Sequence, residues 1–314
     1  TKGPTRTDLP AAAEGPPMTT FQVADGVHGI DAELFDLGFL SAYLFNDAEP
    51  TLVDPGHAAG AETVLDGVRD CGVDPADIKH VVCSHVHVDH AGAASTILDA
   101  APEADVYIHE MTAPHLADPS ELIASSREAM GEYFDHMGEQ GPVPEDRIEM
   151  VSSDGTTLDI GANTLELRHL PGHSPDHFAI WNAERDLLFA AECLGGYLER
   201  ATNFFPPSTL PNFDVALIEE AIAHLQELDP EHVLFPHFGA WPGDSAAVFE
   251  HAERELHRYD ERILALHDET GAAEETKARV RADLMDISPP YDPAVAEFYT
   301  SLVTDGYLKY HDRL

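Results

Sequence analysis

The sequence predicts an α/β protein. Short apolar runs typical of β-strands alternate with segments whose apolar residues recur at helical spacing. The chain has 314 residues, 43% of them hydrophobic, which suffices for a large core. Metal-binding side chains follow directly on several of the predicted strands. Loops at the ends of strands therefore carry the candidate site, as in many α/β enzymes.

The first third of the chain predicts alternating strands and helices behind an irregular start. Residues 1–17 are rich in Pro, Gly, Thr and Ala, which predicts a disordered tail. Patterns of β-branched and aromatic residues then predict strands over Gln22–Val27, Ala32–Leu37, Leu40–Asn46, Thr51–Asp54, Ile78–Cys83 and Val106–His109. Helical spacing predicts helices over Ala59–Cys71, which ends at Gly72, and over Gly92–Ala101.

The pattern repeats less clearly in the rest of the chain. Strands are predicted over Thr164–His169, His177–Trp181 and Asp186–Ala190. Helices are predicted over Ser120–Met137, Asp214–Leu228, Phe249–His267, Glu274–Met285 and Pro293–Tyr310. We interpret residues 110–146 as an insertion that either gates the substrate or packs an apolar stripe on the sheets. The C-terminal helices either cover the rim of the site or form a dimer face.

Residues 84–92 are the most informative stretch of the chain. They place four side chains that can bind metal, His85, His87, Asp89 and His90, directly after an apolar run. Imidazole and carboxylate together suit zinc and similar divalent ions. His85 and His87 point to the same side if the strand continues, because side chains alternate along a strand. One metal ion needs only three such ligands, so the spacing predicts half of a two-metal site.

Four further places deliver a polar residue where an apolar run ends. Asp54 follows Thr51-Leu52-Val53, and His173 follows a Pro-Gly turn. Glu192 closes the run Leu187–Ala191, and His237 follows Val233-Leu234-Phe235-Pro236. Ligands at strand ends can gather along one edge of a sheet. Aromatic residues follow the ligand strands and predict either an apolar wall or core packing: Tyr197, Phe204, Phe205, Phe238 and Trp241.

These five motifs, in this order, resemble those of the metallo-β-lactamase-fold hydrolases over roughly residues 20 to 240. The resemblance implies a four-layer αββα sandwich over residues 18–244, with residues 245–314 as a C-terminal helical extension. It implies a first metal ion held by His85, His87 and His173, and a second held by Asp89, His90 and His237. Glu192 takes the place of the bridging carboxylate, and Asp54 that of the acid that orients the ligand loop.

One position departs from the family pattern. The family usually has an aspartate after a glycine at the bridge, whereas this chain has Ala191 followed by Glu192. The resemblance implies two divalent metal ions as cofactors, with zinc favoured and iron or manganese as alternatives. Two segments at the insertion, Val106–Glu110 and Pro114–Pro119, resemble a subgroup of archaeal and bacterial metallo-hydrolases. They narrow the family resemblance to that subgroup.

The net charge of the chain indicates the salt concentration at which it is stable and the kinds of partner that it can bind. The net charge is −41, from 58 acids against 17 bases, of which four are lysine. Such a chain repels itself in dilute buffer, whereas at molar salt the Debye length falls to about 3 Å. We therefore expect an extreme halophile. The acidic surface and the lack of a basic cluster disfavour nucleic acid and anionic membranes as partners and leave a small-molecule substrate.

The remaining composition predicts a soluble cytoplasmic protein. Cys71, Cys83 and Cys193 lie far apart and form no C-x-x-C pair, so no disulfide framework is indicated. Cys193 neighbours Glu192, but a small buried apolar role is favoured for it. The sequence has no stretch of 18 apolar residues and no charged-then-apolar leader.

The expected function follows from what two adjacent metal ions do. They lower the pKa of a shared water from ~15.7 toward about 7, so that hydroxide is available at neutral pH. Asp89 holds an ion in this scheme, and Asp54 fixes the orientation of a histidine. We expect hydrolysis of a small ester, thioester or lactone. The alternatives are a phosphodiesterase or nuclease of the same fold, a mononuclear-iron persulfide dioxygenase, and a metal-stabilised scaffold without turnover.

Overall fold

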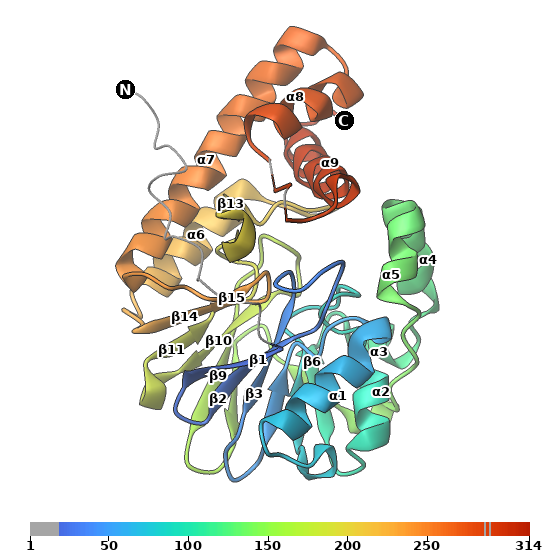
Figure 1. The fold of residues 1–314 in the computed structure, drawn as a ribbon, viewed down its shortest axis with the longest axis vertical. Helices are drawn as coiled ribbons and strands as arrows, with labels where there is room; N and C mark the ends of the chain where they lie inside the picture. The colour runs from blue at the N-terminus through green and yellow to red at the C-terminus, as the bar shows by residue number, and fades with distance from the viewer. Residues whose placement is uncertain (1–18, 286, 289) are drawn as a thin grey trace.

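Two β-sheets lie face to face in the computed structural model (Figure 1). The structure describes residues 19–285, 287–288 and 290–314. The tail predicted over residues 1–17 lies outside these residues. Helices cover the outer faces of both sheets, and three long C-terminal helices stand at one end of the sandwich (Figure 1).

The first sheet has seven strands within the described residues, in the order β1 to β7. They are β1 Thr20–Ala24, β2 Val27–Asp31, β3 Ser41–Phe45, β4 Thr51–Val53, β5 His80–Val82, β6 Asp105–His109 and β7 Ile148–Val151. The pairs up to β3–β4 are antiparallel, and those from β4–β5 onward are parallel. Parallel neighbours need a crossover, which α1 (Ala61–Asp70) supplies between β4 and β5 and α2 (Ala94–Ala100) between β5 and β6. Residues 110–147 connect β6 to β7.

The second sheet has six strands within the same described residues, in the order β15-β14-β11-β10-β9-β8. They are β8 Thr156–Asp159, β9 Thr164–His169, β10 Phe178–Asn182, β11 Leu187–Phe189, β14 His232–Phe235 and β15 Gly239–Ala240. β11 and β14 are parallel, and α6 (Val215–Gln226) lies between them in the chain. A small ribbon of β12 (Gly196–Leu198) and β13 (Asn203–Phe205) follows β11.

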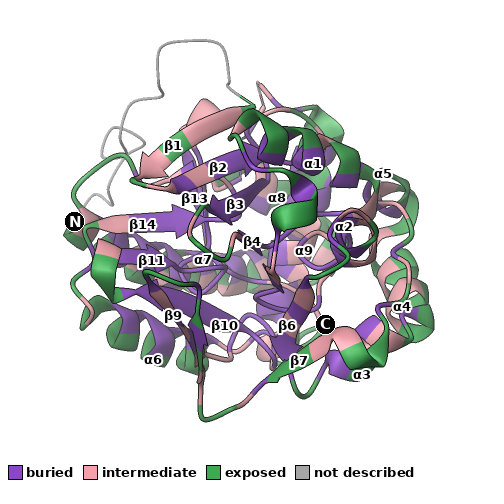
Figure 2. Cartoon of the chain, turned by 90° about the horizontal axis from the view of Figure 1, so that it is seen from below, coloured by how far each residue is buried: buried purple, intermediate pink, exposed green. Residues whose placement is uncertain are grey.

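The space between the sheets is filled by apolar side chains from both of them. This inner core includes Tyr43 and Val82 from the first sheet and Phe178, Ile180 and Phe189 from the second, all fully buried. A second core lies between the sheets and their helices. The strands are largely buried and the outer helix faces are exposed in Figure 2. This layering confirms the predicted αββα sandwich with C-terminal helices.

The first predicted strands differ from the observed ones. The strand predicted over Gln22–Val27 contains a turn at Gly26, whose φ is +70°, and this turn separates β1 from β2. The strand predicted over Ala32–Leu37 is a loop. The Asp31 carboxylate holds this loop by accepting hydrogen bonds from the backbone N–H groups of Glu33 and Gly38. Side-chain capping of a loop of this kind competes with strand pairing.

The insertion is helical but broken. It contains α3 (Ala113–Ala117), α4 (Ser120–Met130) and α5 (Phe134–Met137). The single helix predicted over Ser120–Met137 is therefore wrong. Gly131 interrupts it with a φ of +57°, a left-handed conformation that favours glycine.

Three helices follow the sandwich: α7 (Ser245–Thr270), α8 (Ala273–Asp283) and α9 (Pro293–Tyr310). The carboxylates of Asp244 and Asp292 cap α7 and α9 by accepting from the N–H groups of Ala246 and Ala294. These helices confirm the predicted C-terminal helices. In the described part of the chain, none of the helices is both long and apolar enough to cross a membrane.

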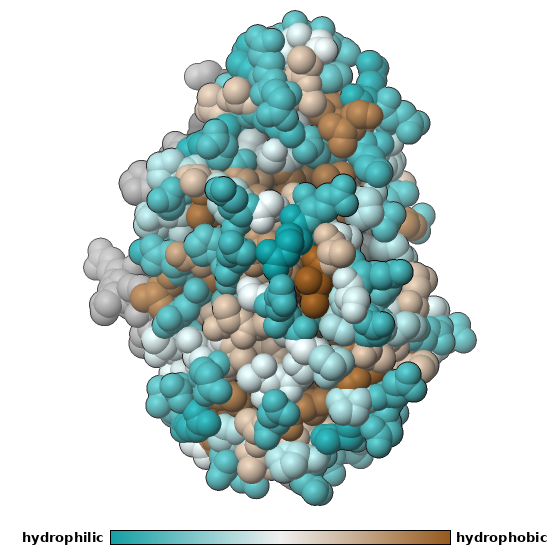
Figure 3. Space-filling model, turned by 90° about the vertical axis from the view of Figure 1, so that its right-hand side faces the viewer, coloured by the Kyte–Doolittle hydropathy of each residue, from teal (hydrophilic) through white to brown (hydrophobic). Residues whose placement is uncertain are grey.

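The hydrophilic outer surface bears on how salt affects the thermal stability of the protein. The face in Figure 3 is mostly hydrophilic, with apolar atoms in small separate groups. We expect the melting temperature to rise in molar KCl, because the repulsion within a net charge of −41 is then screened. Relief of about 3 to 5 kcal/mol would raise it by roughly 5 to 8 °C in a chain of this length. A melting temperature that stays the same from dilute buffer to molar KCl would contradict the halophilic interpretation.

Candidate metal centre

The candidate site lies where strands of both sheets end. Asp54 follows β4, and the loop that carries His85 and His87 follows β5, its parallel neighbour. Glu192 follows β11, and His237 follows β14, which is parallel to β11. Carboxyl ends of parallel neighbours lie at the same edge of a sheet. The two edges therefore bring residues that are far apart in the sequence into one site.

Four side chains form the first group of donors. Its ligand atoms all lie within 4.8 Å of one another, and it consists of His85, His87, His173 and Glu192. Nδ1 of His87 lies 2.9 Å from Nε2 of His85 and 3.1 Å from Nε2 of His173. Three imidazole nitrogens thus converge on one position, and a carboxylate oxygen of Glu192 lies beside them.

The second group consists of Asp89, His90 and His237, also with ligand atoms within 4.8 Å of one another. Oδ2 of Asp89 lies 3.6 Å from Nε2 of His90 and 3.5 Å from Nε2 of His237. These three residues and the four of the first group are the seven ligands expected from the sequence. The structure brings all seven together, divided as the family resemblance implies.

Glu192 lies between the two groups. Its Oε2 is 2.8 Å from Nε2 of His173 and 3.4 Å from Nε2 of both His85 and His90. Its Oε1 is 3.8 Å from Nε2 of His237. The longer side chain of glutamate therefore reaches the bridging place in this chain. Ala191 before it has a φ of +44°, a left-handed conformation that glycine adopts more readily.

Asp54 holds the ligand loop, the role that the family resemblance implies for it. It is 1% exposed and does not belong to either donor group. Oδ1 accepts a hydrogen bond of 2.7 Å from the backbone N–H of Ser84. Oδ2 accepts one of 2.8 Å from the Ser84 hydroxyl and lies 2.8 Å from Nδ1 of His90. The carboxylate thereby fixes the start of the loop and the orientation of one histidine ring.

Backbone carbonyls orient two further histidines. Nδ1 of His173 lies 2.8 Å from the Pro207 carbonyl, and Nδ1 of His237 lies 3.1 Å from the Phe39 carbonyl. A carbonyl only accepts, so Nδ1 carries a proton, and in the neutral ring Nε2 then keeps its lone pair. The Nε2 atoms of both rings face the centre of the site. This is the tautomer that a metal ligand requires.

The arrangement fits a pair of metal ions. Nε2 of His90 is enclosed and has no hydrogen-bond partner within the described residues, although carboxylate oxygens lie near it. A buried polar atom without a partner is rare in a native structure. A cation at the centre would satisfy this nitrogen and the converging nitrogens of the first group. Nitrogen and carboxylate donors together suit zinc or iron.

The pKa values of two donor histidines favour the neutral form that binds a cation, whereas neighbouring carboxylates raise those of His90 and His173 against the effect of burial. Burial, together with the charges of His90 and His87, holds the pKa of His85 well below its ordinary value. Burial and His173 lower the pKa of His87 to about 4. Both rings are therefore neutral at pH 7 and can donate a lone pair.

The two carboxylic acids of the site, Glu192 and Asp89, are held in their charged form. Burial raises the pKa of Glu192, but the neighbouring His173 and its hydrogen bonds more than offset this and hold the pKa well below the ordinary value. Burial likewise opposes ionisation of Asp89, and His90 and His237 overcome it, so that the pKa of Asp89 is lowered. Two carboxylates thus remain ionised where positive charge would be bound.

Two supporting residues were missed by the sequence reasoning. The Asp176 carboxylate accepts from the N–H of Val86, at 2.9 Å, and from the hydroxyls of Thr112 and Ser174. It thereby ties the first ligand loop to the second sheet. Nε2 of His177 accepts a hydrogen bond of 2.9 Å from the N–H of Glu192. Both follow His173 within four residues, and a Ser-Pro-Asp-His turn was the signal available.

Residues that the sequence left open fall outside the donor groups. The thiol of Cys193 faces the Leu170 carbonyl and His177, and burial raises its pKa, so it is a buried structural thiol. The three cysteines are free, in agreement with the lack of a predicted disulfide framework. His115 lies half-buried on α3 and does not line the pocket.

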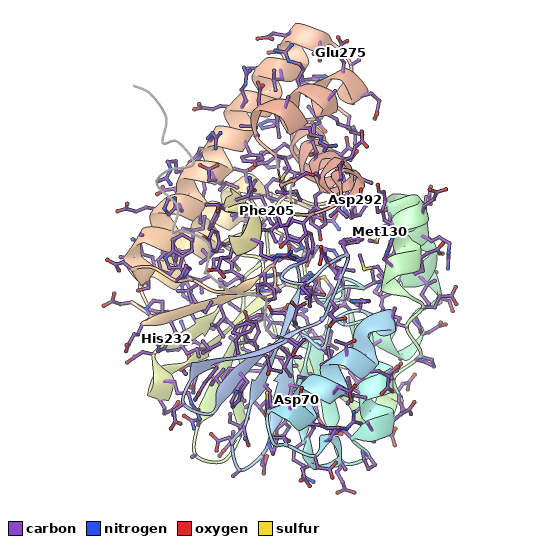
Figure 4. The ribbon with its side chains drawn as sticks, in the orientation of Figure 1. Asp70, Met130, Phe205, His232, Glu275 and Asp292 are labelled. Carbon is purple, nitrogen blue, oxygen red and sulfur yellow. The ribbon has the colours of Figure 1, made fainter. Side chains whose placement is uncertain are left out.

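A pocket with a volume of about 120 Å³ opens over both donor groups. Its floor includes His87, Asp89, His173, Glu192 and His237. Its walls come from α4, α5, the loop after β13 and α9, through Ser126, Ala129, Met130, Met137, Phe205, Pro206, Ser208, Thr209, Leu210, Phe298, Tyr299, Leu302 and Val303. Figure 4 shows Met130 projecting from α4 toward the body of the molecule, with Phe205 further in. The insertion and the C-terminal helices both reach the site.

Comparison with known proteins agrees with the fold. A profile described as the metallo-beta-lactamase superfamily matches residues 36–237, which is more than half of the chain. The chain belongs to the metallo-β-lactamase superfamily. Among curated relatives, a probable metallo-hydrolase of Bacillus subtilis is 21% identical over 232 residues, which cover 69% of this chain and 85% of that protein. The chain therefore has the fold of this superfamily, and its two donor groups could hold metal ions.

Other relatives match over shorter stretches. A rubredoxin-oxygen oxidoreductase of Megalodesulfovibrio gigas is 28% identical over 178 residues, 54% of this chain. The match spans 38% of that protein, and the match to an Aquifex aeolicus protein of unknown role spans 60% of it. The chain thus spans less than two thirds of these two relatives.

Solved structures share the fold over most of the chain. A metallo-β-lactamase superfamily protein from Sulfolobus tokodaii superposes with a TM-score of 0.67 at 17% identity, over 91% of this chain and 98% of that one. A family protein from Thermus thermophilus gives a TM-score of 0.66 at 19% identity, over 93% and 94% of the two chains. At this level of identity the likeness concerns the fold.

Proposed function

We propose that the protein hydrolyses a small, uncharged ester, thioester or lactone at a pair of divalent metal ions. The observation that carries the proposal is a pocket with metal-binding side chains at its floor and apolar side chains in its walls. Seven nitrogen and carboxylate donors lie in two groups at the base of the pocket, and five of them line it. Glu192 of the first group also lies near His90 and His237 of the second. The walls are largely apolar and, among the described residues, include neither lysine nor arginine.

His85, His87 and His173 would hold one ion, and Asp89, His90 and His237 the other, with Glu192 between them. When bound, two such ions supply a nucleophilic hydroxide at neutral pH and polarise the bond that is attacked. The chain itself holds the donors in place through Asp54 and the carbonyls of Pro207 and Phe39. We propose zinc as the native metal, because imidazole and carboxylate donors suit it.

The pocket favours an uncharged substrate. Asp89 and Glu192 place two carboxylates at its floor, and no basic side chain among the described lining residues offsets them. Two divalent ions would outweigh these two carboxylates, but a phosphodiester would have to rely on the ions alone, because the described lining offers it no lysine or arginine. The apolar walls suit an acyl chain instead. This supports an acyl substrate over the phosphodiesterase alternative.

A second candidate function is oxidative chemistry at iron. It is supported by the matched rubredoxin-oxygen oxidoreductase and by the fold likeness to a chemotaxis sensor described as a peroxy diiron species, with a TM-score of 0.53. Elemental analysis of protein purified in high salt separates the two candidates. Zinc supports hydrolysis, whereas iron together with oxygen uptake supports the oxidative alternative.

The substrate panel gives a direct test. We expect zinc-loaded protein to hydrolyse p-nitrophenyl hexanoate, a hexanoyl thioester or a lactone with a kcat/KM at least about 100-fold above that for bis-p-nitrophenyl phosphate. A difference of this size corresponds to about 2.7 kcal/mol of transition-state stabilisation. Chelator-treated protein is the control for each substrate. A preference for the phosphodiester would reject the assignment, and so would equal rates with and without metal.

A further inference from the structure

Four buried tyrosines donate a hydrogen bond from the hydroxyl to a backbone carbonyl. Tyr43 donates to the Phe235 carbonyl at 2.7 Å, and Tyr307 donates to the Leu256 carbonyl at 2.8 Å. Tyr259 donates to the Leu284 carbonyl at 3.0 Å, and Tyr291 donates to that of Gly38. A buried tyrosine hydroxyl normally finds such a partner, because an unpaired polar group loses the hydrogen bonds that it made to water.

Tyr299 on α9 differs from these four. It is 8% exposed, and within the described residues its hydroxyl has no hydrogen-bond partner. Tyr299 lines the pocket, and its oxygen is not one of the fully enclosed unpaired atoms, which include Nε2 of His90. The same pocket has Asp89 and Glu192 in its floor. A tyrosine whose hydroxyl has no protein partner therefore lines the space above the metal donors.

The ring of Tyr299 is held firmly by other aromatic rings. Its centroid lies 4.9 Å from that of Phe39, 5.9 Å from that of Phe205 and 6.0 Å from that of His237. Phe298, its neighbour on α9, packs against it at 5.5 Å. Contacts on several sides limit the rotamers available to the ring. The hydroxyl is thus fixed in place before a ligand arrives, which reduces the entropy lost on binding.

We propose that the Tyr299 hydroxyl is a substrate-binding group, which donates a hydrogen bond to the carbonyl oxygen of the acyl substrate in the pocket. The proposal rests on the proposed function and assigns a residue of the C-terminal helices to the site. A neutral donor matches a neutral carbonyl, in a pocket whose described lining holds no lysine or arginine.

The hydrogen bond would strengthen during hydrolysis. The carbonyl oxygen gains negative charge as the carbonyl carbon is attacked, and a donor aimed at that oxygen binds the transition state better than the substrate. The hydroxyl of a tyrosine ordinarily has a pKa of about 10. The group therefore keeps its proton at neutral pH and remains a donor.

The test compares Tyr299→Phe with Tyr307→Phe, a matched removal of a hydroxyl from the same helix. Tyr307 is fully buried and outside the pocket lining. We expect Tyr299→Phe to lower kcat for p-nitrophenyl hexanoate about 100-fold, with a smaller change in KM and an unchanged metal content. Tyr307→Phe should retain the kcat of the wild type and lose some thermal stability instead.

Binding of 2-octanone adds a readout that does not need turnover, because this ketone has a carbonyl and an apolar chain but no leaving group. We expect zinc-loaded Tyr299→Phe to bind it about 3- to 10-fold more weakly than the wild type and than Tyr307→Phe, by calorimetry. A wild-type protein that hydrolyses none of the acyl compounds rejects the proposed function, whereas the ketone still decides the role of Tyr299. The inference is overturned if the wild type does not bind the ketone, or if Tyr299→Phe retains the wild-type ketone affinity or kcat.

Discussion

Replacement of His85 by alanine is expected to lower kcat/KM for the acyl substrate by at least about 10³-fold, equivalent to about 4 kcal/mol of transition-state stabilisation. His85 is fully buried, and its Nε2 lies 2.9 Å from Nδ1 of His87 and 3.4 Å from Oε2 of Glu192. Its loss removes one of three converging nitrogens and leaves a void where a ligand stood. The metal content should fall from two ions per chain toward one.

Elemental analysis and steady-state kinetics on the same preparations measure both effects. His115→Ala is the matched control, because this histidine lies on α3 outside both donor groups and outside the pocket lining. The control should keep two ions and full turnover. Two bound ions in His85→Ala would remove this residue from the ligand set, and full turnover in that variant would reject the site as the place of catalysis.

Replacement of Asp54 by alanine is expected to lower the free energy of unfolding by about 3 to 5 kcal/mol, the usual result of breaking a buried charged network. The change leaves the N–H and hydroxyl of Ser84 and Nδ1 of His90 without their acceptor. Asp54 also has a φ of +45°, which alanine adopts less readily than aspartate or asparagine. His90 belongs to the second donor group, so the ion of that group should be lost first.

Asp54→Asn separates the two contributions, because asparagine tolerates the same backbone conformation and keeps one acceptor oxygen. It should lose less stability than Asp54→Ala and still show weakened metal binding. Asp70→Ala, at an exposed position at the end of α1, is the control and should change stability by less than about 0.5 kcal/mol. Urea denaturation of metal-free protein gives the comparison. Equal stability of Asp54→Ala and the control would show that the buried hydrogen bonds of Asp54 are not needed.

The donor set was predictable from the sequence because each donor stands where an apolar run ends. His173, Glu192 and His237 are far apart in the chain, yet each is local to its own strand or turn. The family resemblance then supplied their grouping and the layer order. Local patterns were less reliable where a side chain captures the backbone, as Asp31 does in the loop that had been predicted as a strand.

Residues that act on the site through tertiary packing could not be predicted in the same way. Asp176 supports the loop of His85 and His87 from the other sheet, a relation that depends on how the sheets pack. Tyr299 lies on a helix whose apolar pattern predicts burial, and nothing in that pattern distinguishes a tyrosine that faces a pocket from one that faces the core. The unpaired hydroxyl becomes visible only when the positions of its neighbours are known.

The pocket draws its floor and its walls from separate parts of the chain. All seven donors belong to loops of the sandwich, whereas much of the wall comes from residues 126–137 on α4 and α5 and 298–303 on α9. Substitutions on these helices can thus reshape the recognised acyl group while the chemistry below stays intact. Selection for a new substrate, such as a nutrient or a toxin, could therefore act on the residues of α4 and α9. We expect relatives with the same donors to differ first in the sequence of these helices.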